Sequence, residues 1–98
     1  MTEPGGRRRP AWRFGNQIRR VRRQRGLRIL VESPALCRYT LNEWQTYFER
    51  RLRRRSRSVY DMYLYLGHLQ GGSILKFKFK WSDDGEWGER VFEIEIED

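Results

Sequence analysis

The chain has 98 residues, a length that corresponds to one small domain. Its apolar fraction of 38% is low for a globular protein and its aromatic fraction of 14% is high, which together indicate a compact aromatic core joined to a disordered segment. A single cysteine, Cys37, excludes an internal disulfide and a thiolate metal cluster, and no apolar run is long enough to span a membrane. We therefore expect no membrane association, no metal site and no cofactor.

The net charge of +8 is distributed unevenly along the chain. Residues 1–57 hold seventeen arginines against four glutamates, a balance of +13, whereas residues 58–98 have a balance of −5. All three lysines lie at positions 76, 78 and 80, so the basic half uses arginine alone. Because the planar arginine fork binds phosphate bidentately and stacks on bases, this composition favours a nucleic-acid partner. A GC-rich coding bias is the alternative explanation.

Residues 1–26 predict a flexible basic arm. The first ten residues contain two glycines and two prolines and are expected to be disordered, while Trp12 and Phe14 either attach the arm to the core, which we favour, or stack on bases. Asn16 can cap and Gly26 can end a short helix at about residues 16–25, which at that length forms only when its charge is neutralised. The candidate phosphate contacts on this segment are Arg19, Arg20, Arg22, Arg23 and Arg25.

In composition, this segment resembles the arginine-rich RNA-binding peptides of viral regulatory proteins. The resemblance covers about ten residues and implies an arm that folds on RNA. A nuclear-import signal is a second, compatible interpretation.

Residues 40–58, TLNEWQTYFERRLRRRSRS, predict an amphipathic helix. Thr40 and Glu43 have the spacing of a capping box, and a helical period separates the apolar side chains from the arginines. The apolar face holds Leu41, Trp44, Phe48 and Leu52, with Tyr47 at its edge, and the opposite face holds Arg50, Arg53, Arg54 and Arg57. Six arginines between residues 50 and 57 repel one another without a polyanion, so we interpret this face as phosphate-binding. A solvated helix face is the alternative.

Alternating apolar and polar residues predict strands at residues 27–32, 36–39, 59–66, 74–81 and 90–97. On the third of these, Tyr63 and Tyr65 share a face that suits base stacking, unless they pack against the arm. The last two strands are expected to form a hairpin in which three lysines lie across from Glu93, Glu95 and Glu97, so that the lysines are structural. The acidic end of the final strand either protects an open edge or pairs with a second copy as a homodimer.

The expected fold class is therefore α+β: a small antiparallel sheet of three to five strands packed on one amphipathic helix, with a disordered arginine-rich N-terminal arm. Its core joins Met62, Leu64, Phe77, Phe79, Phe92 and Ile94 to Trp44, Phe48 and Leu52. The arm covers residues 1–26, and a single α+β domain covers residues 27–98.

The sequence contains few candidate catalytic residues. His68 is the single histidine and lies beside a glycine turn, and Cys37 next to Arg38 has no base to activate it, although the neighbouring cation favours a thiolate. Asp83, Asp84, Glu86 and Glu89 lack the spacing of a calcium loop. We expect a protein that is not an enzyme.

Two functions remain. The first is a small arginine-rich regulatory or packaging protein that binds nucleic acid, with RNA favoured over DNA. A viral origin is one candidate. The binding residues are those of the arm and the helix face together with Tyr63 and Tyr65. The second is an adaptor that engages a partner protein through its charged arm or sheet surface. The expected location is the nucleus in a eukaryote or its virus, otherwise the cytoplasm, and the protein is not expected to be secreted.

Overall fold

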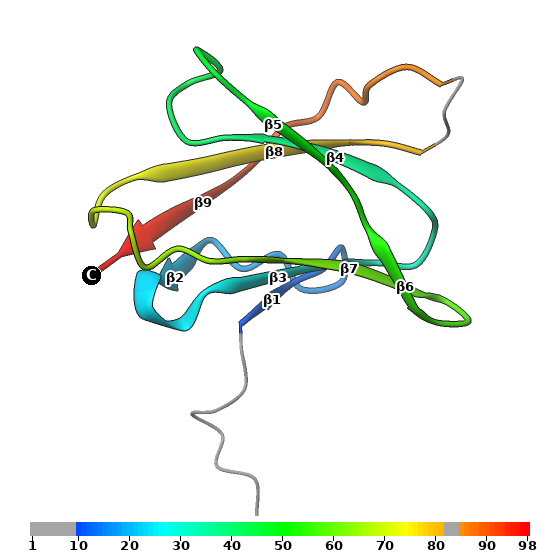
Figure 1. The fold of residues 1–98 in the computed structure, drawn as a ribbon, viewed down its shortest axis with the longest axis horizontal. Helices are drawn as coiled ribbons and strands as arrows, with labels where there is room; N and C mark the ends of the chain where they lie inside the picture. The colour runs from blue at the N-terminus through cyan, green and yellow to red at the C-terminus, as the bar shows by residue number, and fades with distance from the viewer. Residues whose placement is uncertain (1–9, 82–84) are drawn as a thin grey trace, which may run out of the picture.

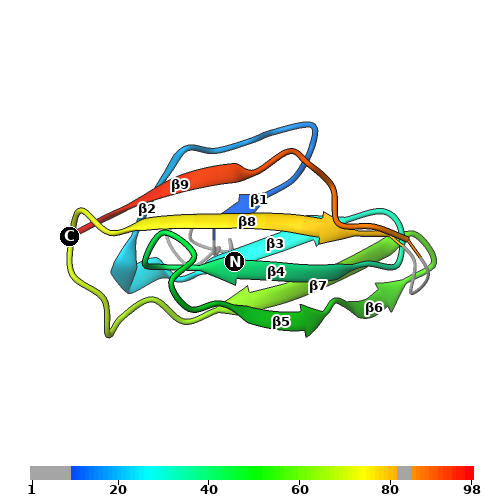
Figure 2. The ribbon, with the colours of Figure 1, turned by 90° about the horizontal axis from the view of Figure 1, so that it is seen from above.

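The computed structural model describes residues 10–81 and 85–98. They form a sandwich of two β-sheets, seen edge-on in Figure 1 and from above in Figure 2. The four-stranded sheet has the order β1 (Ala11–Trp12), β3 (Leu27–Val31), β7 (Val59–Leu64) and β6 (Arg53–Ser56). The five-stranded sheet has the order β2 (Arg20–Arg22), β9 (Phe92–Glu97), β8 (Ile74–Lys80), β4 (Leu36–Thr40) and β5 (Phe48–Arg51).

The α+β prediction is wrong. Among the described residues the helical structure is one 3₁₀ turn, η2 (Arg23–Arg25), and the layer expected to be a helix is a second sheet. The five strands expected from alternation are confirmed as β3, β4, β7, β8 and β9. Strand β9 is not an edge, because β2 pairs with it in parallel on the side away from β8.

The expected helix at residues 40–58 is instead a turn followed by β5 and β6. Thr40 does act as a cap, but of a turn: its hydroxyl accepts hydrogen bonds from the backbone N–H groups of Asn42 (3.3 Å) and Trp44 (3.1 Å). Glu43 and Trp44 then adopt positive φ angles of 60° and 68°, which a right-handed helix does not accommodate. Past this turn, a helix would place arginines one turn apart, whereas a strand directs successive arginines to opposite faces.

The described part of the expected arm also belongs to the sandwich. Strand β1 pairs in parallel with β3, and the segment expected to be a helix at about 16–25 contains β2 and η2. Val21 is buried opposite Ile96, and this burial fixes the strand. The prediction of a disordered arm for residues 1–9 lies outside the described residues.

Trp12 is the centre of the core, so its predicted role as an attachment is confirmed. It is 1% exposed, and its ring lies 4.9 Å from that of Phe77 and 4.7 Å from that of Phe92, both in edge-to-face geometry. Of the three residues expected to cover the sheet from a helix, Leu52 alone is buried, since Phe48 is 53% exposed and Trp44 lies partly exposed.

Candidate nucleic-acid interface

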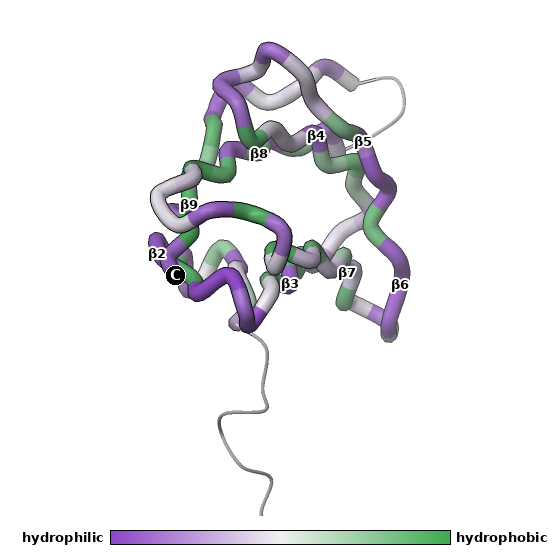
Figure 3. The backbone as a smooth tube through the Cα atoms, turned by 60° about the vertical axis from the view of Figure 1, so that its left-hand side comes forward, coloured by the Kyte–Doolittle hydropathy of each residue, from purple (hydrophilic) through white to green (hydrophobic). Residues whose placement is uncertain are grey.

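A single chain segment carries six of the eighteen arginines to one side of the sandwich. Strand β5 lies at the edge of one sheet and β6 at the edge of the other, and between them Leu52 is buried, its N–H donating to the carbonyl of Ala35 at 3.0 Å. Every residue of β5 and β6 is exposed. Figure 1 shows the chain passing from β5 into β6, and Figure 3 shows how hydrophilic β6 is. We call this the arginine edge, made of Arg50, Arg51, Arg53, Arg54, Arg55 and Arg57.

Hydrogen bonds to neutral carbonyls orient two of these arginines. Arg50 donates from Nη1 to the carbonyl of Tyr63 at 3.0 Å, so it bridges β5 and β7, and Arg54 donates from Nε to the carbonyl of Ser56 at 3.3 Å. Such bonds fix the direction of a guanidinium but leave its full positive charge. The arginine edge can therefore accept further anionic ligands.

Asp61 is the acid built into this region. It is 2% exposed and accepts a hydrogen bond from Arg28 Nε at 2.6 Å on Oδ2 and from Arg55 Nε at 2.7 Å on Oδ1. Burial alone raises its pKa, but the hydrogen bonds and charges of Arg55 and Arg28 outweigh burial and hold the pKa below its usual value of 3.8. One carboxylate thus serves two guanidinium groups, which leaves the region positive.

The other predicted cluster lies on the opposite edge of the five-stranded sheet, four strand spacings or about 19 Å away. Acids of the chain's own C-terminus surround it. Arg20 Nε lies 3.7 Å from Glu95 Oε1, and Arg20 Nη1 lies 3.7 Å from Glu97 Oε2. Arg23 Nε lies 2.7 Å from Asp98 Oδ1. The structure therefore does not join Arg19, Arg20, Arg22, Arg23 and Arg25 to the arginine edge.

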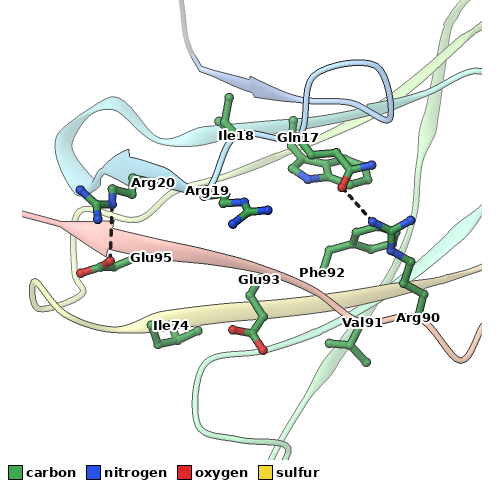
Figure 4. A pocket seen from close by; sticks show the side chains of 11 residues that line it. Gln17, Ile18, Arg19, Arg20, Ile74, Arg90, Val91, Phe92, Glu93 and Glu95 are labelled. Atoms are coloured by element: carbon green, nitrogen blue, oxygen red, sulfur yellow. Dashed lines mark hydrogen bonds and ion pairs between the residues drawn. The ribbon is translucent and has the colours of Figure 1, made fainter.

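Beside this second cluster is a pocket of about 490 Å³ (Figure 4). Arg19 and Arg20 line it together with Glu93 and Glu95, so positive and negative groups share its walls. Across its rim, Arg90 donates to the side-chain carbonyl of Gln17 at 3.2 Å. The mixed charge makes this pocket a weaker phosphate site than the arginine edge.

The two tyrosines expected to stack on bases have different surroundings. Tyr63 packs over Gly26, since a Cβ added to that glycine would lie 2.1 Å from the tyrosine hydroxyl, and this agrees with the alternative of packing against the arm. Tyr65 is 67% exposed and stacks on His68 with ring centroids 5.8 Å apart. Tyr65 keeps an open ring face, and Tyr63 is partly covered.

An aromatic surface that the sequence did not reveal lies on the outer side of β4, β5 and β8. The Cζ atom of Arg38 lies 4.5 Å from the ring centre of Tyr47 and 4.2 Å from that of Trp87. Lys78 Nζ lies 5.2 Å from the ring centre of Trp44. We call this surface the aromatic face: Arg38, Trp44, Tyr47, Lys78, Lys80 and Trp87.

The strand register explains why the lysines were misjudged. Lysines were expected to face three glutamates, but in the β8–β9 pair Glu93 lies across from Lys76 and Glu95 across from Ile74. Glu95 and Glu97 pair instead with β2. Lys76 bonds to Glu43 and lies near Glu93, whereas the ion pairs of the described residues do not include Lys78 or Lys80. Among the described residues, the predicted pairing with glutamate is therefore found for Lys76.

The candidate catalytic side chains, Cys37 and His68, lie in different environments. Cys37 is fully buried, and burial raises its pKa to about 12 despite the opposing charge of Arg50, so a neighbouring arginine does not favour the thiolate here. His68 is exposed beside Tyr65. Within residues 10–81 and 85–98, no three of the His, Cys, Asp and Glu side chains gather as metal ligands would.

Comparison of the chain with protein-family models, curated proteins and solved structures gives no match. In the described part of the chain, no helix has both the length and the apolar character needed to cross a bilayer. The functional argument therefore rests on the charges and surfaces of this structure.

Proposed function

We propose that this protein binds nucleic acid, with RNA favoured, through the arginine edge, and that it acts by binding rather than by catalysis. The observation that carries the proposal is the crossing from β5 to β6, which exposes six arginines along one side of the sandwich. Neighbouring acids are already engaged: Glu49 by Arg38, and Asp61 by Arg28 and Arg55. A bound polyanion would neutralise the remaining repulsion between the arginines of the edge, and it would release its own counterions on binding.

RNA is favoured over duplex DNA because the two ligands are recognised by different structural elements. The major groove of DNA is most often read by an α-helix, and the helical structure of the described residues is one 3₁₀ turn of three residues. Sequence recognition of RNA mostly uses single-stranded segments lying on sheet or loop surfaces. The open strands of the arginine edge suit that geometry.

The test compares two double variants with the same loss of charge. Arg53→Gln with Arg57→Gln removes exposed arginines of the edge, and Arg13→Gln with Arg90→Gln removes exposed arginines elsewhere. Fluorescence anisotropy with labelled RNA is measured across a salt series. We expect the edge variant to bind more weakly and to lose about one unit of salt slope for each phosphate contact removed, and the control to retain the slope.

Equal effects of the two variants would mean that the arginines act as diffuse charge, and the proposal would be wrong. A third variant, Arg20→Gln with Arg22→Gln, measures the second cluster, where acids of β9 reduce the expected effect. Point substitutions are preferable to removal of residues 1–26, because that truncation also removes Trp12 from the core. If RNA does not bind at all, the adaptor function is tested next by capture of acidic protein partners.

A further inference from the structure

The aromatic face carries rings and cations that lie outside the buried core. Trp44, Tyr47 and Trp87 lie outside the buried core, and Tyr47 is 49% exposed. We propose that this face is a stacking platform for the unpaired bases of single-stranded RNA. The inference rests on the proposed function and adds a selectivity: single strands over duplexes.

Arg38 organises the platform. Glu49 accepts hydrogen bonds from Nε (2.8 Å) and Nη2 of Arg38, so the plane of the guanidinium is fixed. The same guanidinium lies against the rings of Tyr47 and Trp87. Both rings are therefore held in place before a ligand arrives, which lowers the entropy lost on binding.

Cations surround these rings in rows across the sheet. Strand pairing places Lys78 beside Arg38 in one row, and Arg51 and Lys80 on either side of Leu36 in the next. Lys80 Nζ lies 5.9 Å from the ring centre of Trp87. The sequence between β8 and β9, which holds Trp87, contains four acids, Asp83, Asp84, Glu86 and Glu89, whereas the cations of this surface belong to β4, β5 and β8. Phosphates flanking a stacked base would meet this positive side.

The platform and the arginine edge form one continuous surface. Arg51 of the arginine edge lies beside Leu36, in the row next to that of Arg38 and Lys78, and its strand β5 leads through Leu52 into β6. A strand of RNA can thus keep phosphates on the edge while its bases lie on the rings. Bases in a duplex have both faces covered by neighbouring pairs, so a duplex can use the edge alone.

The test uses three probes of equal length: an oligouridine RNA, an abasic strand with the same phosphates, and a blunt RNA duplex. The variant Tyr47→Ala with Trp87→Ala removes the rings, and Tyr47→Phe with Trp87→Phe retains them as the control. We expect the alanine variant to lose at least about fivefold in affinity for oligouridine for each stacked base and to bind the abasic strand and the duplex like the unmodified protein. The phenylalanine variant should retain most of its affinity for oligouridine.

Thermal unfolding of each variant confirms that the fold is intact. If the unmodified protein binds oligouridine, abasic strand and duplex equally, and the alanine variant does the same, the platform is refuted while the arginine edge stands. If none of the probes binds, the proposed function itself fails. A heparin oligosaccharide serves as a further probe that carries charge but no bases. If it competes with oligouridine on the unmodified protein and loses affinity in the alanine variant, the platform is also refuted. That result would show that the aromatic rings recognise sugar rings instead of bases.

Discussion

Replacing Asp61 by Asn should separate stability from binding. The substitution preserves the volume of the side chain but removes the charge that receives hydrogen bonds from Arg28 at 2.6 Å and Arg55 at 2.7 Å. Hydrogen bonds to a charged group contribute about 1.5–3 kcal/mol each. The arginine side chains are 38% and 52% exposed, so water replaces part of the loss, and we expect a net cost of about 2–3 kcal/mol.

For a domain of this size, that cost corresponds to a fall in Tm of roughly 10–20 °C. The pKa of Asp61 is lowered in the folded state, so its contribution is complete above its usual pKa of 3.8 and is lost as the pH falls below that value. Urea unfolding at neutral pH should therefore show the full difference between the two proteins, and the difference should shrink in acid. A neutral-pH difference below about 0.5 kcal/mol, which is typical of a surface substitution, would refute the reasoning.

The same substitution should strengthen RNA binding. Asp61→Asn releases Arg28 and Arg55 from their shared carboxylate and adds one unit of positive charge beside the arginine edge. We expect tighter binding and a steeper salt dependence in the anisotropy assay. If the variant is fully folded under the assay conditions and binds RNA more weakly, Asp61 positions Arg55 for the ligand. It then does not compete with the RNA for Arg55.

Three further outcomes test the fold. Cys37, whose pKa is raised to about 12, should resist a thiol reagent at neutral pH until the protein unfolds, and rapid labelling of the native state would contradict its burial. Trp12→Ala should cost about 3–5 kcal/mol in chemical denaturation. Gly26→Ala should destabilise by about 1–3 kcal/mol, because φ is +69° and the new Cβ meets Tyr63, whereas Gly15→Ala, with open space around it, should be nearly neutral.

The strands that sequence predicted well have two chemically different faces. In β8, buried Leu75 and Phe77 alternate with partly exposed lysines, and in β9 buried Phe92 and Ile94 alternate with glutamates. Such a pattern determines which face of each strand points into the core, because a shift of the strand pairing by one residue would bury the charged side chains. The hairpin between them was therefore predictable, but its register depended on side-chain packing, as the pairing of Phe77 with Phe92 shows.

The segment 40–58 was misjudged because its apolar spacing satisfied a helix by coincidence. Its conformation is set by a network around Thr40 and by pairing with β4 and β7, contacts that a local period does not contain. Strand β2 was missed for a similar reason, since its partner β9 lies over seventy residues later. The positive charge of the arginine edge was visible in the sequence, and the aromatic face was not, because its rings come from separate loops.

The open sides of β5 and β6 also govern how copies of this protein behave toward one another. In the described part of the chain each of these strands pairs with one neighbour, so a row of backbone groups faces outward and can act as a template for another strand. Arginines along both strands keep such edges apart by repulsion, but the range of that repulsion falls from about 10 Å at 0.1 M salt to about 3 Å at 1 M. Concentrated salt therefore removes a colloidal barrier, and storage at low ionic strength should keep the free protein dispersed.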